Sequence, residues 1–274
     1  MRRRYGLCLL LLWTAACSQK QVAVAPPPPP PPPAVVANPQ ATALYANLWI
    51  QRSAEYQALC RQVYQDAERV ILERFSRVRL SKPPAVILDL DETVIDNSGF
   101  QTWLHRQSAT YSSGGWGQWE RWQAGEGQVE AVPGALAFLR ALEQAGVTPV
   151  FVSNRKESAR EQTVKALVRL GALQHDEPER LLLRTDTSSK IERRAVVAEK
   201  WSVLALVGDN LADFDGVFEA EAGDLEARNA RVAELADKWG SEWFVLPNPV
   251  YGDWVGALGP DLEQRLDGPA ELPE

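Results

Sequence analysis

The sequence predicts an α/β fold, a doubly wound parallel sheet with helices on both faces. Between residues 85 and 246, short apolar runs that read as strands alternate with amphipathic stretches that read as helices, which is typical of a parallel sheet. Polar side chains follow the ends of several apolar runs, where open parallel sheets bind their ligands. The chain has 274 residues, of which 45% are hydrophobic, so it is long enough for one large domain with appendages.

The first residues read as an export signal rather than as part of the fold. Residues 2–4 are arginines, and the apolar run at 7–13 is too short to span a bilayer. Small residues then precede Cys17, an arrangement that resembles a bacterial lipobox. We therefore expect residues 1–16 to be a signal peptide and Cys17 to carry a lipid that anchors the protein to a membrane. Ordinary cleavage at the same place, without a lipid, is the alternative.

Residues 17–40 are expected to form a proline-rich linker behind the lipid anchor. Prolines fill positions 26–33 without interruption, and such a run adopts polyproline II, a semi-rigid spacer of about 3 Å per residue. The linker would hold the following domain away from the membrane. A ligand for a proline-binding module is the competing interpretation.

Residues 41–80 are predicted to form helices. Apolar residues recur at helical spacing from Tyr56 to Val78, which indicates a long amphipathic helix, and a second helix is expected to start near Ala41. The prolines at 83 and 84 end the helical pattern. These helices offer a surface for a homodimer. Cys60 lies on the apolar stripe and is the lone cysteine of the mature domain, so we expect it to be a buried small side chain.

The alternating part of the chain predicts the sheet and its helices. Strands are expected at 85–90, 147–152, 181–183, 203–207 and 243–246. Helices are expected at 134–144, 156–170, 189–200 and 225–239. The tryptophan-rich segment 97–132 does not read as another strand and helix, so we expect a small, mainly helical cap insert there. The whole domain is placed at 41–260, and residues 261–274 are expected to form a flexible tail.

Two carboxylates at the end of the first predicted strand suggest the chemistry. The run Val-Ile-Leu at 86–88 delivers Asp89 and Asp91 to a strand end, where unpaired carboxylates are costly and a metal ion is the usual partner. Other strand ends bring Ser153 with Asn154, and Asp209 with its neighbours. Each polar group alone has a commonplace explanation as a turn, a helix cap or a surface residue. Their joint occurrence at successive strand ends predicts one site.

These motifs resemble a known family. In order along the chain they are Asp-Leu-Asp-Glu-Thr at 89–93, Ser-Asn-Arg at 153–155, Lys190, and Gly-Asp-Asn at 208–210 followed by Asp213. The set resembles the four motifs of the haloacid dehalogenase superfamily, and more narrowly its DDDD phosphohydrolases, the class C acid phosphatases. The likeness runs from about Leu44 to Gly256 and includes Pro-Asn-Pro-Val-Tyr-Gly-Asp-Trp at 247–254.

The resemblance implies a haloacid dehalogenase-like Rossmannoid fold and a Mg²⁺-dependent acid phosphatase of the 5′-nucleotidase type. Members of this family are bacterial outer-membrane lipoproteins and secreted enzymes that act on nucleotides and other phosphomonoesters. We therefore expect a small phosphorylated substrate, with nicotinamide mononucleotide among the possible ones, and a location at the outer membrane. The substrate preferred by this chain stays open.

The expected roles follow from phosphoryl-transfer chemistry. Asp89 would attack phosphorus and form an aspartyl-phosphate, while Asp91 would protonate the leaving oxygen and then activate water. Asp209 would complete a Mg²⁺ site with the Asp89 carboxylate and the backbone carbonyl of Asp91, because Mg²⁺ prefers hard oxygen ligands. Asp213, one helical turn after Asp209, would ligate the metal directly or hold a metal-bound water. Asp96 and Asp215 are not needed for this mechanism.

Phosphate and ring binding complete the expected site. Ser153, Asn154 and the adjacent backbone N–H groups would hydrogen-bond the phosphoryl oxygens, and Lys190 would neutralise phosphate and nucleophile. By the resemblance, Trp119 and Tyr251 match two aromatic residues that stack on a nucleobase or nicotinamide ring. The register of the glycine-rich segment before Trp119 leaves two other tryptophans of the insert, at 116 and 122, as alternatives.

Composition and motif content exclude several other functions. The net charge of −7 argues against a nucleic-acid binder, which would show a basic face. His105 and His175 are too few and too far from the motifs for a histidine-based phosphatase. A dehalogenase is disfavoured because its chemistry needs only the nucleophile. A surface protein that binds a ligand on the same fold without turnover stays the alternative from another class.

Overall fold

The computed structural model describes residues 41–125 and 127–269. The predicted signal peptide, Cys17 and the proline-rich linker lie outside the described residues. Within the described part of the chain, no helix is both long enough and apolar enough to cross a membrane.

Five parallel strands form the central sheet, in the order β5-β4-β1-β6-β7. Their bounds are β1 Pro84–Leu88, β4 Thr148–Lys156, β5 Leu181–Arg184, β6 Ser202–Gly208 and β7 Trp243–Val245. The chain adds β4 and β5 on one side of β1 and then β6 and β7 on the other. Strand β1 therefore marks the switch point of the sheet, where a crevice opens at the carboxyl ends of the strands.

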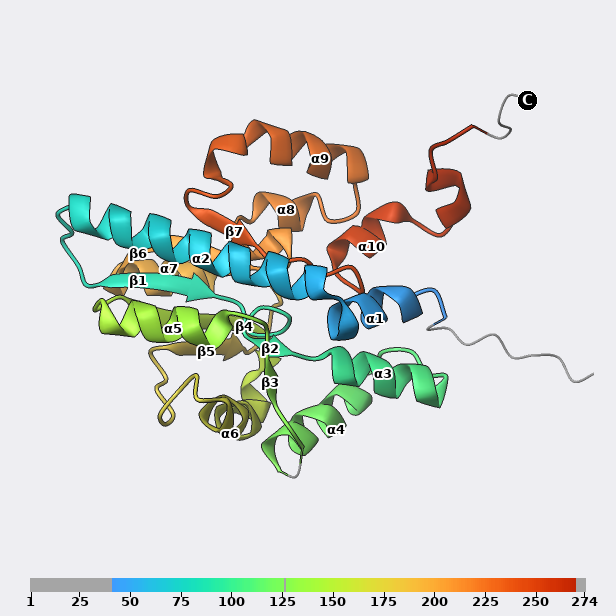
Figure 1. The fold of residues 1–274 in the computed structure, drawn as a ribbon, viewed down its shortest axis with the longest axis horizontal. Coiled ribbons are helices and arrows are strands. Elements are labelled where there is room, and N and C mark those ends of the chain that lie inside the picture. The colour runs from blue at the N-terminus through green and yellow to red at the C-terminus, as the bar shows by residue number, and fades with distance from the viewer. Residues whose placement is uncertain (1–40, 126, 270–274) are drawn as a thin grey trace, which may run out of the picture. The chain divides into compact units, whose positions relative to one another are not determined.

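Helices cover both faces of the sheet, which confirms the predicted doubly wound fold (Figure 1). Val86 and Leu88 of β1 belong to a core cluster that also contains residues of α2 (Ala54–Arg77), α5 (Ala135–Gln144) and α6 (Arg160–Leu170). Ala85 and Ile87 point to the opposite face, against α7 (Ile191–Lys200). This alternation follows from the two-residue period of a strand that is buried on both sides.

On the α7 side of β6 and β7, a smaller aromatic core joins the remaining helices. Phe214, Phe218 and Trp243 are buried together there. The elements in this region are η2 (Leu211–Asp213), α8 (Val217–Ala220), α9 (Leu225–Glu234) and η3 (Ala236–Lys238). The short helices α10 (Asp253–Leu258) and η4 (Leu262–Arg265) follow β7.

The N-terminal helices are two, as predicted, and Ser53 separates them. Helix α1 spans Leu44–Arg52 and α2 begins at Ala54, because Ser53 has extended backbone angles and its side chain caps α2 by accepting a hydrogen bond from the N–H of Tyr56. Cys60 on α2 is fully buried in the main core, as its place on the apolar stripe predicted.

The tryptophan-rich insert is a cap built from two helices on a small antiparallel ribbon. The ribbon pairs β2 (Ile95–Asp96) with β3 (Glu130–Ala131), and the helices are α3 (Ser98–Gln107) and α4 (Ser113–Ala124). Figure 1 shows α3 and α4 side by side, joined to the sheet through β2 and β3. Buried Phe100 packs against the rings of Trp103 and Trp116 and forms the centre of the cap, while Trp103, Tyr111 and Trp122 are partly exposed.

Two predicted boundaries were wrong near the site. Strand β4 does not end at Val152 but continues to Lys156, because it pairs with β5 again after a register shift. The helix predicted from residue 156 therefore begins at Arg160, after the short 3-10 helix η1 (Glu157–Ala159). Beyond the sheet, the helix predicted at 225–239 ends at Glu234 and is followed by η3.

Candidate active site

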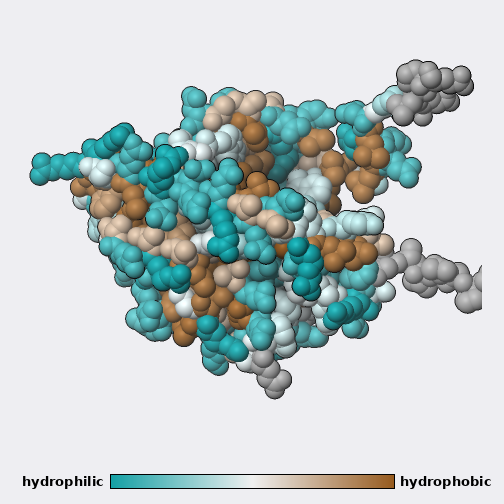
Figure 2. Space-filling model, in the orientation of Figure 1, coloured by the Kyte–Doolittle hydropathy of each residue, from teal (hydrophilic) through white to brown (hydrophobic). Residues whose placement is uncertain are grey.

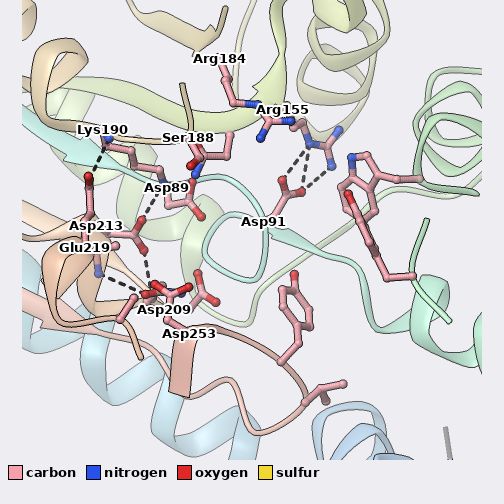
Figure 3. Close-up of a pocket in the computed structure, with 18 of the residues that line it drawn as sticks. Asp89, Asp91, Arg155, Arg184, Ser188, Lys190, Asp209, Asp213, Glu219 and Asp253 are labelled. Atoms are coloured by element: carbon pink, nitrogen blue, oxygen red, sulfur yellow. Dashed lines mark hydrogen bonds and ion pairs between the residues drawn. The ribbon is translucent and has the colours of Figure 1, made fainter. Parts of the chain in front are cut away.

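The carboxyl ends of β1, β4 and β6 face a cavity of about 660 Å³ (Figure 3). The predicted residues Asp89, Asp91, Lys190, Asp209 and Asp213 line it, together with Asn154 and Tyr251. The structure thus brings together side chains that lie up to 162 positions apart in the sequence, at the switch point of the sheet.

A tight loop after β1 directs both first-motif aspartates into the cavity. The N–H of Asp89 still donates to the carbonyl of Val207 on β6 at 3.0 Å, so the sheet fixes its position. The carbonyl of buried Leu90 then accepts hydrogen bonds from the N–H groups of Val94 and Ile95, each at 2.8 Å. Asp89 and Asp91, two positions apart, both line the cavity, and the turn at Leu90 ends the strand between them.

Three carboxylates converge on the β6 side of the cavity. One oxygen each of Asp89, Asp209 and Asp213 lies within 4.8 Å of the others. The ammonium group of buried Lys190 donates to Asp89 Oδ1 at 2.5 Å and to Asp213 Oδ1 at 2.6 Å. A glycine at position 208 lets the Asp213 carboxylate lie against the backbone, since a Cβ there would lie 2.4 Å from Asp213 Oδ2.

The surroundings of these carboxylates favour a bound cation. Burial raises the pKa of Asp89 to about 7, with repulsion from Asp213 adding to the increase and the attraction of Lys190 opposing it. Burial, with repulsion from Asp213 and Asp89, also raises the pKa of Asp209 well above its usual range. Three carboxylates facing one lysine leave an excess of negative charge, and the donors are all hard oxygens. This set fits a divalent cation.

The Asp91 carboxylate is held on the opposite side of the cavity. Arg155 from β4 contacts Asp91 Oδ1 through Nη2 at 2.7 Å and through Nε at 3.0 Å, and Asn97 Nδ2 donates to the same oxygen at 2.8 Å. The Arg155 side chain is fully buried, and its Nη2 also donates to Gln123 Oε1 on α4 at 3.0 Å. Its guanidinium lies over the Trp116 ring, 5.5 Å from the ring centre.

Asn97 connects the Asp91 carboxylate to the cap. Its Oδ1 accepts hydrogen bonds from Trp119 Nε1 at 2.8 Å and from Gln123 Nε2 at 3.0 Å. Its N–H donates to Glu92 Oε1 at 3.1 Å. Asn97 is therefore fully satisfied in a buried position between the loop after β1 and helix α4.

Trp116 reaches the cavity, whereas Trp119 does not line it. Trp119 stacks on Trp122 with ring centres 4.6 Å apart and turns its N–H towards Asn97. Trp116 lines the cavity together with Phe100, Tyr111 and Tyr251. The structure thus places the alternative Trp116 where the resemblance led us to expect Trp119, so the cap ring that could face a substrate is Trp116.

Tyr251 forms hydrogen bonds with two residues of the site, Glu92 and Asn248. Its hydroxyl donates to the carboxylate of Glu92, and its N–H donates to Asn248 Oδ1 at 3.3 Å. Asn248 Nδ2 in turn donates to Asp209 Oδ2 at 2.8 Å. Burial raises the pKa of Glu92 well above its usual range, with Asp91 and Asp209 adding to the increase.

Ser153 and Asn154 take different positions at the end of β4. Ser153 is fully buried, does not line the cavity, and accepts a hydrogen bond from the N–H of Arg155 through Oγ at 3.1 Å. Asn154 is exposed to the cavity, and its Oδ1 accepts from Arg193 Nη2 at 2.7 Å. A phosphate contact by Asn154 is consistent with this placement, while one by Ser153 stays a prediction.

Several residues of the site received no role from the sequence. Arg155 belongs to the Ser-Asn-Arg motif, but its burial in β4 was not foreseen because the strand was predicted to end at residue 152. Asn97 lies four residues after the end of the first motif and carried no signal of its own. Asn248 lies in the matched segment at 247–254. Gln123, in a helix of the insert, carried no signal in the sequence.

Comparison with known proteins agrees with this geometry. Residues 30–254 match the model of a family described as HAD superfamily, subfamily IIIB (Acid phosphatase). A solved structure of the class C acid phosphatase from Bacillus anthracis is similar, with a TM-score of 0.74 and 33% sequence identity over 84% of this chain and 95% of that chain. A structure of class C acid phosphatase from the same organism with tungstate bound has a TM-score of 0.74 and 32% identity, with the same coverage.

Proposed function

This chain belongs to the acid phosphatases of HAD superfamily subfamily IIIB and hydrolyses phosphomonoesters, and from this premise we propose that it is a Mg²⁺-dependent 5′-nucleotidase that works through an aspartyl-phosphate. One observation carries the proposal. Asp89, Asp91 and the three-carboxylate cluster that could hold a cation meet in one cavity, which four aromatic side chains also line.

Asp89 is the proposed nucleophile. It lies beside Lys190, and phosphoryl transfer depends mainly on positioning and on the stabilisation of charge. An Oδ atom of Asp89 would attack phosphorus and form the phosphoryl-aspartate while the ester oxygen leaves. Lys190, held between Asp89 and Asp213, would offset the negative charge that gathers around the transferred group.

Asp91 is the proposed proton shuttle, and its contacts distinguish its two oxygens. Oδ1 takes three hydrogen bonds of 3.0 Å or shorter from Arg155 and Asn97. Oδ2 has one contact, to Arg155 Nε at 3.3 Å. Oδ2 is therefore the oxygen free to give a proton to the leaving group and then to take one from the water that hydrolyses the phosphoryl-aspartate.

Mg²⁺ is the proposed cation. Asp89, Asp209 and Asp213 supply the side-chain oxygens, and the backbone carbonyl of Asp91 remains the further ligand that we propose. When bound, Mg²⁺ would neutralise charge on the phosphoryl oxygens and on these carboxylates. Burial, and to a smaller extent repulsion between the carboxylates, raises the pKa of Asp89 and of Asp209, and a bound cation would offset both effects.

The aromatic wall supports a nucleoside or nicotinamide as the leaving group. Trp116 and Tyr251 face the same cavity as Asp89, with Phe100 and Tyr111 beside them. Stacking tolerates different rings because each base has a π-face, which suits an enzyme with several nucleotide substrates. Tyr251 is positioned by Asn248, so the ring wall and the cation cluster depend on one loop.

A phosphate-release assay tests the proposal. We expect purified protein with Mg²⁺ to hydrolyse nucleoside monophosphates and nicotinamide mononucleotide, and to lose this activity in EDTA. Trp116→Ala and Tyr251→Ala should raise KM for nucleotides more than for a small alkyl phosphate, whereas Arg140→Ala, at an exposed position on α5, serves as the control. Equal activity on ribose 5-phosphate and on nucleotides, unchanged in both variants, would refute the nucleotidase assignment.

We also propose that the chain is a lipid-anchored protein of the bacterial outer membrane, attached through Cys17. The small residues before Cys17 and the proline-rich segment after it support this location. Incorporation of labelled fatty acid that is absent from Cys17→Ser is the expected result, and equal labelling of both proteins would exclude the anchor.

A homodimer through α1 is the remaining proposal about partners. Leu44, Tyr45 and Leu48 on this helix are exposed, and Figure 2 shows apolar side chains gathered over α1. Sedimentation analysis should give twice the chain mass, and Tyr45→Glu should yield the monomer. A monomeric wild type would refute this part.

A further inference from the structure

A second, smaller cavity adjoins the active site. Its volume is about 260 Å³, and it shares Tyr111, Trp116, Asn154 and Arg184 with the larger cavity. The remaining lining comes from α4 of the cap and from the segment that joins β4 to α6. A substrate with its reacting phosphate at Asp89 could therefore extend past Trp116 into this space.

Three cationic side chains line the second cavity. Lys156 and Arg184 are paired positions on the adjacent strands β4 and β5, so their side chains leave the same face of the sheet from backbones about 4.8 Å apart. Arg121 approaches from α4. Figure 3 shows Arg184 entering the pocket from the side where Arg155 lies. Like charges this close repel one another.

These three cations form no ion pair in the described part of the chain, although Lys156 exerts a weak attraction on Glu120. None of the ion pairs formed within residues 41–125 and 127–269 involves Arg121, Lys156 or Arg184. The arrangement contrasts with a chain whose net charge is −7.

One carboxylate, that of Glu120, lines the second cavity, and its burial limits how far it can offset the positive charge there. Glu120 is 5% exposed, and its Oε1 has no hydrogen-bond partner. Burial raises the pKa of Glu120, against the attraction of Arg155, so the charged form of this group is disfavoured. Ser158 and Ala159, just before the start of α6, add the positive end of a helix dipole.

We propose that the second cavity binds a second phosphate group of the substrate, so that phosphomonoesters carrying another phosphate are preferred over matched monophosphates. The proposal rests on the proposed phosphomonoester hydrolysis at Asp89. Arg184 lines both cavities and would contact the distal phosphate where the two meet, while Lys156 and Arg121 would contact it from the far side. Arginine and lysine pairs with phosphate are among the strong charge-assisted contacts.

Matched substrate pairs test the preference. We would compare kcat/KM for adenosine 3′,5′-bisphosphate with that for adenosine 5′-monophosphate, and for fructose 1,6-bisphosphate with that for fructose 6-phosphate, scoring the first phosphate released. The double variant Arg121→Ala/Lys156→Ala should lower kcat/KM for the bisphosphates by about tenfold or more while monophosphates change less than about twofold. The preference should also weaken as the salt concentration rises. Arg140→Ala, an exposed arginine on α5, is the control.

Failure of this inference can be separated from failure of the phosphatase proposal. If wild type hydrolyses both members of each pair equally and the double variant leaves the ratio unchanged, the second site is refuted and hydrolysis at Asp89 stands. If wild type hydrolyses nothing, titration calorimetry on Asp89→Asn decides the second site alone. If Asp89→Asn binds the bisphosphate more tightly than the monophosphate, and loses this difference when Arg121→Ala and Lys156→Ala are added, the second site is supported. Equal affinities refute it.

Discussion

Asp89 and Asp91 are separated by one buried leucine, yet their surroundings differ completely. Asp89 faces two further aspartates and the ammonium group of Lys190. Asp91 faces a guanidinium and side-chain amides. The difference shows that the loop after β1 only presents the two carboxylates, and that the elements around it decide what each one can do.

The neighbours of the two aspartates come from different parts of the fold. Those of Asp89 come from the end of β6 and the start of α7, on one side of β1. Those of Asp91 come from β4 on the other side and from the cap. One half of the site therefore depends on the sheet and on the helices next to it, while the other half also depends on the docking of the insert.

Asp89→Asn should have the largest effect on activity, because it removes the nucleophile. We expect kcat to fall by about 10⁴-fold or more, as for other covalent nucleophiles. Rapid-quench measurement of the leaving group, phenol from an aryl phosphate, should also show no initial burst. Asp215→Asn is the matched control, since this exposed aspartate only caps α8. Activity of Asp89→Asn within tenfold of wild type would assign the nucleophile elsewhere.

Asp91→Asn should separate the roles of the two aspartates, because it removes proton transfer and leaves the nucleophile. We expect kcat for nucleotides to fall by about 10²- to 10⁴-fold. An aryl phosphate with an acidic phenol needs no proton donor, so it should form the phosphoryl-aspartate at a much less reduced rate. A burst of phenol without release of phosphate is the expected signature. An equal loss for both substrate types would argue against a role in proton transfer.

Arg155→Lys tests whether the arginine positions Asp91. Lysine keeps the charge but cannot make the paired contact to Oδ1, so we expect kcat for nucleotides to fall by about tenfold with little change in KM. The loss should be smaller for aryl phosphates, which a purely structural role would not produce. Arg140→Lys, exposed on α5, controls for the substitution. Equal losses for both substrates would reduce Arg155 to a structural residue.

The smallest expected effect is on stability, and it concerns the Asp89 side. The pKa of Asp89 rises from 3.8 to about 7 on folding, so between these values the folded protein holds a proton that the unfolded chain has released. This contribution to stability is present below pH 3.8 and is lost as the pH rises through about 7.

The melting temperature in EDTA should therefore fall by a few degrees between pH 5 and pH 7.5, and added Mg²⁺ should reverse most of the fall. Asp209→Asn should flatten the dependence because it removes one of the repelling carboxylates, while Asp237→Asn, at an exposed position, should leave it as in wild type. A melting temperature that rises with pH in wild type without metal would contradict the electrostatic interpretation.

The sequence predicted the Asp89 side of the site better than the Asp91 side, for a physical reason. Asp209 and Asp213 directly follow a strand, and the register of a parallel sheet carries strand ends to one edge. Gln123 lies in a helix of the insert, where no periodic pattern relates it to the sheet. Its contact with Arg155 exists only once the cap has docked.

The choice between Trp116 and Trp119 could likewise not be made from the sequence, because it depends on how the cap docks. The two residues lie three positions apart on α4, so both project from similar sides of that helix. Which one meets the cavity depends on the rotation of α4 about its axis, and Asn97 fixes this rotation by accepting the Trp119 N–H. Likewise, the apolar run ends at Val152, but β4 extends to Lys156 because β5 offers it a partner there.

The cap contacts of Arg155 also bear on how such an enzyme can diverge. Gln123 and Asn97 fix Asp91 from within the cap, whereas Trp116 and Phe100 turn other parts of the same small unit towards the ligand. Mutation of Phe100 can change what is recognised and leave the hydrogen bonds to Asp91 in place, whereas Trp116 packs on the guanidinium of Arg155 and affects both. Selection for new substrates can therefore act on one surface of the insert while the chemistry is inherited unchanged on another.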